Sequence, residues 1–192
     1  MILSDQAIQE AIRDKKLIID PAPPHEQYNT TSVDLRLGNI LKIWDQIPIG
    51  LSFVVDYDDV KIQTLSKYAK DAPLDPDGSF TLKPQQFMLA QTLERIGLPL
   101  LSRLAARVEG RSSLARLGVV IHLTAPTIHA DFGGSVGSPI TLEIFNMGPF
   151  HIKIEPGVSK ICQIIVERVE GDHGGAAPSQ FRDQRDPLGG RH

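Results

Sequence analysis

The chain has 192 residues, of which 41% are hydrophobic and 22% charged, and its formal net charge at pH 7 is −3. This length suits a single domain with a core of its own, and the small negative charge offers no general attraction to nucleic acid or to an acidic membrane surface. The single cysteine, Cys162, excludes an internal disulfide framework and a thiolate zinc cluster within one chain.

Cys162 stands in an apolar run over residues 160–166, so we expect it to be buried, and this cysteine usage fits a reducing, cytoplasmic setting. No stretch of the chain approaches the ~20 apolar residues that a membrane helix needs. The N-terminal residues also lack the basic-then-apolar order of a signal peptide. We therefore expect a cytoplasmic protein without a membrane or nucleic-acid partner.

The N-terminal segment is the part of the chain with clear helical periodicity. Ser4 or Asp5 can cap a helix, and apolar side chains recur at helical spacing over residues 7–12 before the basic segment 13–16. Three prolines between residues 21 and 24 then interrupt regular structure. We expect one N-terminal helix that ends well before residue 21.

From residue 32 onward the chain consists of short β-type runs divided by turn residues, among them most of the 16 glycines and 14 prolines. The predicted strands are Ser32–Ile43, Ser79–Leu82, Phe87–Leu93, Ser102–Val108, Val119–Thr124, Ile140–Asn146, His151–Ile154 and Lys160–Val169. The polar segment 56–77 is predicted as a loop with about one helical turn. The pattern therefore indicates a mainly β fold.

The last stretch, residues 171–192, is rich in glycine, arginine and aspartate and has almost no large apolar residue. Such a segment cannot bury enough surface to order itself. Two interpretations remain open for it, a disordered tail or a flap that orders over a ligand. We expect one domain over residues 1–170 followed by this tail.

The densest group of polar residues is the segment 110–118, with the sequence GRSSLARLG. A glycine, Arg111, Ser112 and Ser113 open a short helical stretch near 112–117, and a second glycine closes it. The guanidinium, the two hydroxyls and the backbone N–H groups at a helix start predict a phosphate-binding cradle. Arg116 lies one turn after Ser112 and can share its face. The alternative is a capped helix with solvated arginines.

Local charge supports an anion site in this region. Residues 99–125 hold four arginines against one glutamate, whereas the chain as a whole is negative. An anion site of this protein must therefore be local.

Glu143 lies in the strand-like run 140–146, where Thr141, Glu143 and Phe145 point to one face. A carboxylate among apolar neighbours either has a cationic partner or takes a raised pKa, and a raised pKa suits general acid or base catalysis. The alternative is a structural ion pair with one of the arginines.

The six histidines show no metal-binding spacing, and the zinc deaminase pattern is absent. The chain also has no GxGxxG or Walker sequence and no nucleophile elbow. We therefore expect no metal ligands among these residues. The turn that carries His129 and Asp131 is interpreted either as a simple connection between strands or as part of a pocket rim.

Together these motifs resemble the dCTP deaminase family of the trimeric dUTPase fold superfamily. The resemblance is carried by GRSSLARLG over 110–118, HLTA over 122–125, Leu142-Glu143 with Asn146, and Pro156-Gly157, and it extends from residue 1 to about residue 169. It implies a distorted β-barrel or jelly-roll subunit of the dUTPase-like (β-clip) type and a homotrimer with active sites between subunits.

The implied activity is metal-free deamination of dCTP to dUTP and ammonia, with Mg²⁺ merely accompanying the triphosphate. By resemblance, Glu143 is the general base that activates water for attack on cytosine C4. Ser112 and Arg116 match residues that position the water and stabilise the tetrahedral intermediate. The family also implies dUTP as product and dTTP as an inhibitor.

The resemblance also implies a set of substrate-binding residues. Arg111 and Ser113 fall in the triphosphate-binding stretch, and Ala125 matches the wall near the reactive carbon. Thr141 and Leu142 match the strand whose backbone reads the cytosine edge. These positions are expectations from the family pattern.

Three positions depart from that pattern or match it in part. His129 stands where family members usually carry Asp, with Asp131 two residues on, so we predict little or no dUTPase activity unless Asp131 substitutes. Gln163 occupies the place of a phosphate-contacting Gln in bifunctional relatives, or is a buried strand amide. Gln184 keeps part of a C-terminal closure motif. The alternatives are a dUTP pyrophosphatase, a bifunctional deaminase and dUTPase, and a non-catalytic nucleotide-binding trimer.

Overall fold

The structure is a computed structural model, and it describes residues 1–45, 54–56, 58, 62–171, 174 and 187–188. The chain begins with helix α1 (Asp5–Arg13), whose first turn is capped by Ser4, because the Ser4 side chain accepts a hydrogen bond of 3.3 Å from the Ala7 N–H. Ile8 and Ala11 bury the apolar face of this helix. The predicted N-terminal helix is confirmed.

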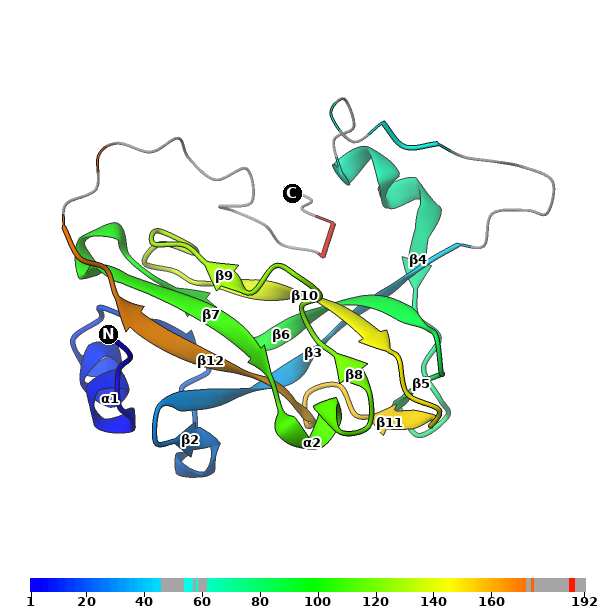
Figure 1. Cartoon of the computed structure of the whole chain (residues 1–192), viewed down its shortest axis with the longest axis horizontal. Helices are drawn as coiled ribbons and strands as arrows, with labels where there is room; N and C mark the ends of the chain where they lie inside the picture. The colour runs from blue at the N-terminus through cyan, green and yellow to red at the C-terminus, as the bar shows by residue number, and fades with distance from the viewer. Residues whose placement is uncertain (46–53, 57, 59–61, 172–173, 175–186, 189–192) are drawn as a thin grey trace.

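A curled antiparallel sheet makes up most of the rest of the molecule (Figure 1). Its central path runs β8-β10-β6-β3-β12-β7-β9, with β1 on β6 and with β2 and β4 on β3, while β5 and β11 pair separately. The long strands are β3 (Ser32–Trp44), β6 (Phe87–Gly97), β7 (Leu104–Gly110), β10 (Ser138–Asn146) and β12 (Lys160–Arg168).

Short elements connect or flank these strands. The short strands are β1 (Ile18–Asp20), β2 (Tyr28–Asn29), β4 (Ala69–Asp71), β5 (Phe80–Leu82), β8 (Val119–Val120), β9 (Thr127–Ile128) and β11 (Ile152–Ile154). The short helices are η1 (His25–Gln27), η2 (Ile62–Tyr68), η3 (Leu100–Ser102) and α2 (Ser112–Ala115).

The core is built largely from the long strands and consists almost entirely of aliphatic side chains. Leu35, Met88, Leu142, Ile144 and Ile164 each have no exposed surface. Burying a side chain of this size contributes roughly 1.5–3 kcal/mol, so this layer holds the strands that carry the candidate site in fixed register.

The mainly β fold predicted from the sequence is confirmed, since each predicted strand overlaps an observed one. Several boundaries differ, and two of these differences have a clear cause in the backbone. The strand expected from residue 102 begins at Leu104, because Pro99 is followed by the turn η3 and by Arg103 in the left-handed region (φ 52°). The strand expected to reach residue 124 ends at Val120, because Leu123 also has a positive φ of 45°.

Four short strands were not predicted, namely β1, β2, β4 and β9. The segment 56–77, predicted as a loop with one helical turn, contains the longer helix η2 and strand β4 in its described part. Runs of two or three residues carry too little periodicity to be recognised, and their pairing depends on neighbours far along the chain.

Cys162 is fully buried as expected, and burial raises the pKa of its thiol. Of the predicted tail, the structure describes Gly171, Gly174, Pro187 and Leu188, and Leu188 is 4% exposed. Gln184 lies outside the described residues, so its role and the division between domain and tail stay predictions. In the described part of the chain, no helix is long and apolar enough to cross a bilayer.

Candidate active site

Helix α2 turns the chain sharply at the end of β7. Arg111 precedes the helix in an extended conformation, and the Arg116 N–H donates to the Ser112 carbonyl at 3.1 Å, which closes one helical turn. Gly118 ends the segment with a φ of 87°. The short helix predicted here is confirmed, and Ser112, Ser113 and Arg116 are exposed on it.

Gly118 is required at this turn for two reasons. Its positive φ disfavours any side chain, and a Cβ there would lie 2.5 Å from the Gly148 backbone nitrogen. We expect Gly118→Ala to lower the free energy of unfolding by about 1–3 kcal/mol, measured by urea denaturation. Gly78→Ala is the matched control, because Gly78 has a similar φ of 82° with no atom within 4 Å of a Cβ. An equal loss of unfolding free energy in Gly118→Ala and Gly78→Ala would contradict the role assigned to the close contact with Gly148.

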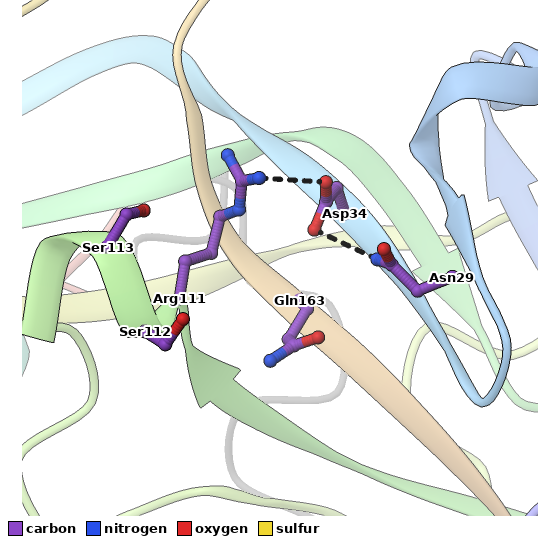
Figure 2. Close-up of a pocket in the computed structure, with 6 residues that line it drawn as sticks. All are labelled: Asn29, Asp34, Arg111, Ser112, Ser113 and Gln163. Atoms are coloured by element: carbon purple, nitrogen blue, oxygen red, sulfur yellow. Dashed lines mark hydrogen bonds and ion pairs between the residues drawn. The ribbon is translucent and has the colours of Figure 1, made fainter.

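A polar pocket of about 160 Å³ opens beside the start of α2 (Figure 2). It is lined by Asn29, Asp34, Arg111, Ser112, Ser113 and Gln163. These residues come from β2, β3, β12 and the β7–α2 junction, which the sheet order brings together. The pocket thus unites four residues that the sequence predicted as substrate-binding or catalytic.

Gln163 lies directly opposite Asp34 in the β12–β3 register. Its side-chain oxygen accepts a hydrogen bond of 2.7 Å from the Ser32 hydroxyl, and its amide nitrogen donates to the Gly110 carbonyl at 3.2 Å. Gln163 is therefore both a half-buried strand amide and a pocket residue, so the two interpretations of this position are compatible.

Glu143 lies on β10, where Leu142 and Ile144 point into the core and Thr141, Glu143 and Phe145 occupy the half-buried opposite face, as the alternation predicts. Burial raises the pKa of the Glu143 carboxyl to about 7. Glu143 forms no ion pair with any residue that the structure describes, so the alternative of a structural salt bridge is not realised.

The segment after β8 lies against the Glu143 strand. The backbone of His122 forms an isolated bridge with that of Glu143, and the Ala125 N–H donates to the His122 carbonyl at 2.9 Å. Leu123, within this turn, has a φ of 45°, a conformation that costs free energy for a large side chain. Ala125 is consequently held in a tight turn that starts beside Glu143.

His129 and Asp131 follow β9 on the next turn. His129 is exposed, whereas Asp131 is partly buried, has a φ of 71° and donates its N–H to the Leu98 carbonyl at 2.8 Å. Aspartate is one of the few residues that tolerate this left-handed conformation. Neither residue lines the pocket beside α2.

The predicted site residues therefore fall into two groups on this chain. Arg111, Ser112, Ser113 and Gln163 surround the pocket, whereas Glu143 lies on β10 with Thr141 beside it. In the described structure no hydrogen bond or ion pair joins Glu143 to Ser112 or to Arg116. Leu142 has no exposed side-chain surface, so only its backbone could contact a ligand.

The positive segment predicted from the sequence is partly neutralised. Arg107 lies 2.9 Å from a Glu167 carboxylate oxygen, and Arg111 lies 3.3 Å from Asp34. Arg116 is exposed and pairs with no acidic residue in the part of the chain that the structure describes. Of the four arginines, Arg111 and Arg116 are thus the two placed beside α2.

Asn29 and Asp34 line the pocket but were not among the predicted site residues. The signal for Asp34 was present, because a carboxylate in the apolar strand 32–37 needs a partner when it is buried. Nothing in the sequence marks Asn29, whose place in the pocket depends on the β2–β3 hairpin.

Groups of three or more His, Cys, Asp or Glu side chains able to hold a metal ion do not occur among residues 1–45, 54–56, 58, 62–171, 174 and 187–188. The Mg²⁺ that the resemblance implies would arrive bound to the nucleotide, as part of the substrate.

Comparisons with known proteins identify the family of this chain. The dCTP deaminase-like family pattern matches residues 2–169. The dUMP-forming dCTP deaminase of Persephonella marina is 38% identical over 191 residues, which cover 100% of this chain and 97% of that protein. The dCTP deaminase of Rhodospirillum rubrum is 31% identical over 195 residues, with 100% and 96% coverage.

The fold has a counterpart among solved structures. The 2′-deoxycytidine 5′-triphosphate deaminase of Agrobacterium tumefaciens superposes with a TM-score of 0.59 and 24% identity, over 86% of this chain. The chain spans about half (47%) of the length of that protein. At this identity the similarity to the solved structure concerns the fold alone. The assignment to a family rests on the family pattern and on the sequence relatives. The chain belongs to the dCTP deaminase-like family.

Proposed function

We propose that this protein deaminates dCTP by hydrolysis, with Glu143 as the general base. The observation that carries the proposal is the half-buried Glu143 carboxyl, whose pKa is raised to about 7 and which has no cationic partner among the described residues. A base whose pKa lies near the working pH is well suited to proton transfer. The names of the sequence relatives supply the substrate, dCTP.

In the proposed reaction, ionised Glu143 removes a proton from a water molecule while the water oxygen forms a bond to C4 of cytosine. The electron pair of the C4=N3 bond moves to N3, and Glu143 passes the proton that it took from the water to N3. Glu143 then takes the proton of the new C4 hydroxyl and passes it to the amino group, the C4–N bond breaks, and ammonia leaves as the C4 carbonyl of uracil forms. Water and dCTP are thus converted to a uracil nucleotide and ammonia, and the step uses groups of the chain alone.

Ser112 and Arg116 are proposed to position the water and to stabilise the charge of the tetrahedral intermediate. Both side chains are exposed on α2, and a hydroxyl and a guanidinium are suitable donors to a developing oxyanion. Arg111 and Ser113 are proposed to bind the triphosphate, with its Mg²⁺, at the pocket beside α2.

The separation of the two groups supports a homotrimer with shared active sites. Among the described residues, Glu143 neither lines the pocket that contains Ser112 nor forms a hydrogen bond or ion pair with Ser112 or Arg116. We propose that Glu143 of one subunit meets Ser112 and Arg116 of a neighbouring subunit. A symmetric assembly would then form each site at an interface.

The product of the reaction is either dUTP or dUMP. His129 in place of the usual Asp supports dUTP, because the carboxylate that the resemblance associates with pyrophosphate release is absent at this position. The second candidate, a dUMP-forming enzyme, is supported by the names of relatives such as that of Persephonella marina. In this case Asp131 would supply the carboxylate that is missing at position 129.

A substrate panel tests the proposal and separates its alternatives. The protein is incubated with dCTP, dCMP, CTP or dUTP in the presence of Mg²⁺, and ammonia and pyrophosphate are measured. The proposal expects ammonia from dCTP without pyrophosphate. Pyrophosphate from dCTP and dUTP would identify the dUMP-forming enzyme, and nucleotide binding without either product would identify a non-catalytic trimer.

The raised pKa of Glu143 predicts the pH dependence of the reaction. The base acts only when ionised, so kcat/KM for dCTP should increase as the pH rises through about 7 and level off above it. The profile is measured with Mg²⁺ in excess, which keeps the triphosphate ionised. A profile that is flat or falls over this range would contradict Glu143 as a base with a raised pKa.

A further inference from the structure

A buried carboxylate lies in the pocket that is otherwise suited to an anion. Asp34 lines this pocket, and its side chain is only 6% exposed. A carboxylate repels phosphate, and a buried charge is costly unless it is paired. The contacts of Asp34 therefore decide what it does there.

Asp34 is held by three partners, two of them cationic. Its Oδ2 lies 3.3 Å from Nη2 of Arg111 and 3.6 Å from Nζ of Lys160, and its Oδ1 accepts a hydrogen bond of 3.3 Å from the Asn29 amide. Figure 2 shows the Arg111 side chain reaching across the pocket to Asp34, with the Asn29 amide on the other oxygen. Two cations against one carboxylate leave this cluster with a net positive charge.

A β-bulge in β12 brings Lys160 to this cluster. Lys160 and Gln163 are three residues apart, so a regular strand would point them to opposite faces. The register shifts between Lys160 and Cys162, and both Ile161 and Cys162 are buried. The bulge thereby places Lys160 on the same face as Gln163, directly beside Asp34.

The same arrangement fixes Arg111 at two points. Its Nη2 lies against Asp34, and its Nη1 donates to the Lys160 backbone carbonyl at 3.3 Å. The Arg111 side chain is still 34% exposed, so its remaining N–H groups can face a ligand in the pocket. An arginine that is already ordered loses less side-chain entropy when an anion binds.

We infer that Asp34 is a positioning residue, which acts through Arg111 to hold the guanidinium ready for the phosphates of the nucleotide. The inference rests on the proposed function for the identity of the ligand, Mg–dCTP. Asp34 itself does not touch the phosphates. Its effect should therefore appear in nucleotide binding and should depend on Arg111 being present.

A double-mutant cycle tests this dependence. Binding of Mg–dCTP is measured by calorimetry in full-length protein carrying Glu143→Gln, which prevents turnover, with Asp34→Asn and Arg111→Gln added singly and together. Asp34→Asn should weaken binding about tenfold, and should change it less than about twofold when Arg111→Gln is already present. Binding of deoxycytidine, which has no phosphate, should not change.

Several results would overturn the inference. The first is an unchanged dissociation constant in Asp34→Asn despite a lower melting temperature. The second is an equal loss of affinity with Arg111 present and with Arg111→Gln. The third is a loss of affinity that disappears when Mg²⁺ is chelated. The last result would place Asp34 on the metal instead of on Arg111. If Asp34→Asn fails to fold, binding of Mg–dCTP to Arg111→Lys is measured instead. This variant keeps the positive charge but cannot contact both the Asp34 carboxylate and the Lys160 carbonyl. Binding as tight as in the parent protein would then contradict the inference.

This experiment is separable from the test of the proposed function. If the protein binds Mg–dCTP but releases no ammonia, the proposed reaction is contradicted. The double-mutant cycle of binding would still show whether Asp34 acts through Arg111.

Discussion

Glu143→Gln is expected to lower kcat for ammonia release from dCTP by about 10²–10⁴-fold, because the amide cannot accept the proton of the attacking water. The dissociation constant for dCTP should stay within about threefold, since Gln has nearly the same shape and Arg111, Ser112 and Ser113 are unchanged. Ammonia release at saturating dCTP, together with calorimetric binding, measures the two quantities.

Glu167→Gln provides the matched control for this substitution. Glu167 is a partly exposed carboxylate on β12 that pairs with Arg107 on the neighbouring strand, away from the pocket. Its loss should leave kcat within about twofold, because exposed ion pairs of this kind contribute little. Undiminished turnover in Glu143→Gln would contradict the assignment of Glu143 as the base.

Mixed assemblies are expected to recover activity that their parent variants lack. Arg116→Gln and Glu143→Gln each disable every site of a homotrimer. If one site takes Glu143 from one subunit and Arg116 from its neighbour, a randomly mixed trimer contains intact sites, and about one quarter of the wild-type activity should return. Ammonia release after unfolding and refolding of an equal mixture measures the recovery.

A mixture of Ser112→Ala with Arg116→Gln is the control for this recovery. Both side chains lie on α2 of the same chain, so every site built from such a mixture lacks one of them. No recovery is expected there. Recovery in neither mixture would contradict sites shared between subunits, even if Glu143 is the base.

The sequence alone predicted those features that depend on local pattern. The alternation in 140–146 correctly placed Glu143 opposite the core residues of its strand, and the two glycines that flank the α2 segment correctly predicted a short helix there. Both depend on residues within one strand or one turn, where side-chain periodicity and glycine conformation determine the outcome.

Features that depend on distant pairing were not predicted. The four strands β4 to β7 lie between Asp34 and Arg111 in the sequence. The two residues meet because β12 lies between β3 and β7. The bulge that brings Lys160 to Asp34 has no clear sequence signal either. The positively charged segment 99–125 was interpreted as a whole as an anion site. In the structure, however, Arg107 forms an ion pair with Glu167.

The central claim is that this protein adds water to C4 of dCTP, and the most direct measurement is mass spectrometry of the nucleotide formed in H₂¹⁸O. We predict a uracil nucleotide with one ¹⁸O atom in the base, none in its phosphates, and one ammonia released per dCTP consumed. The same reaction with Glu143→Gln should leave dCTP unchanged over that time. Unaltered dCTP with the wild-type protein, or ¹⁸O in the phosphates without any in the base, would contradict the claim.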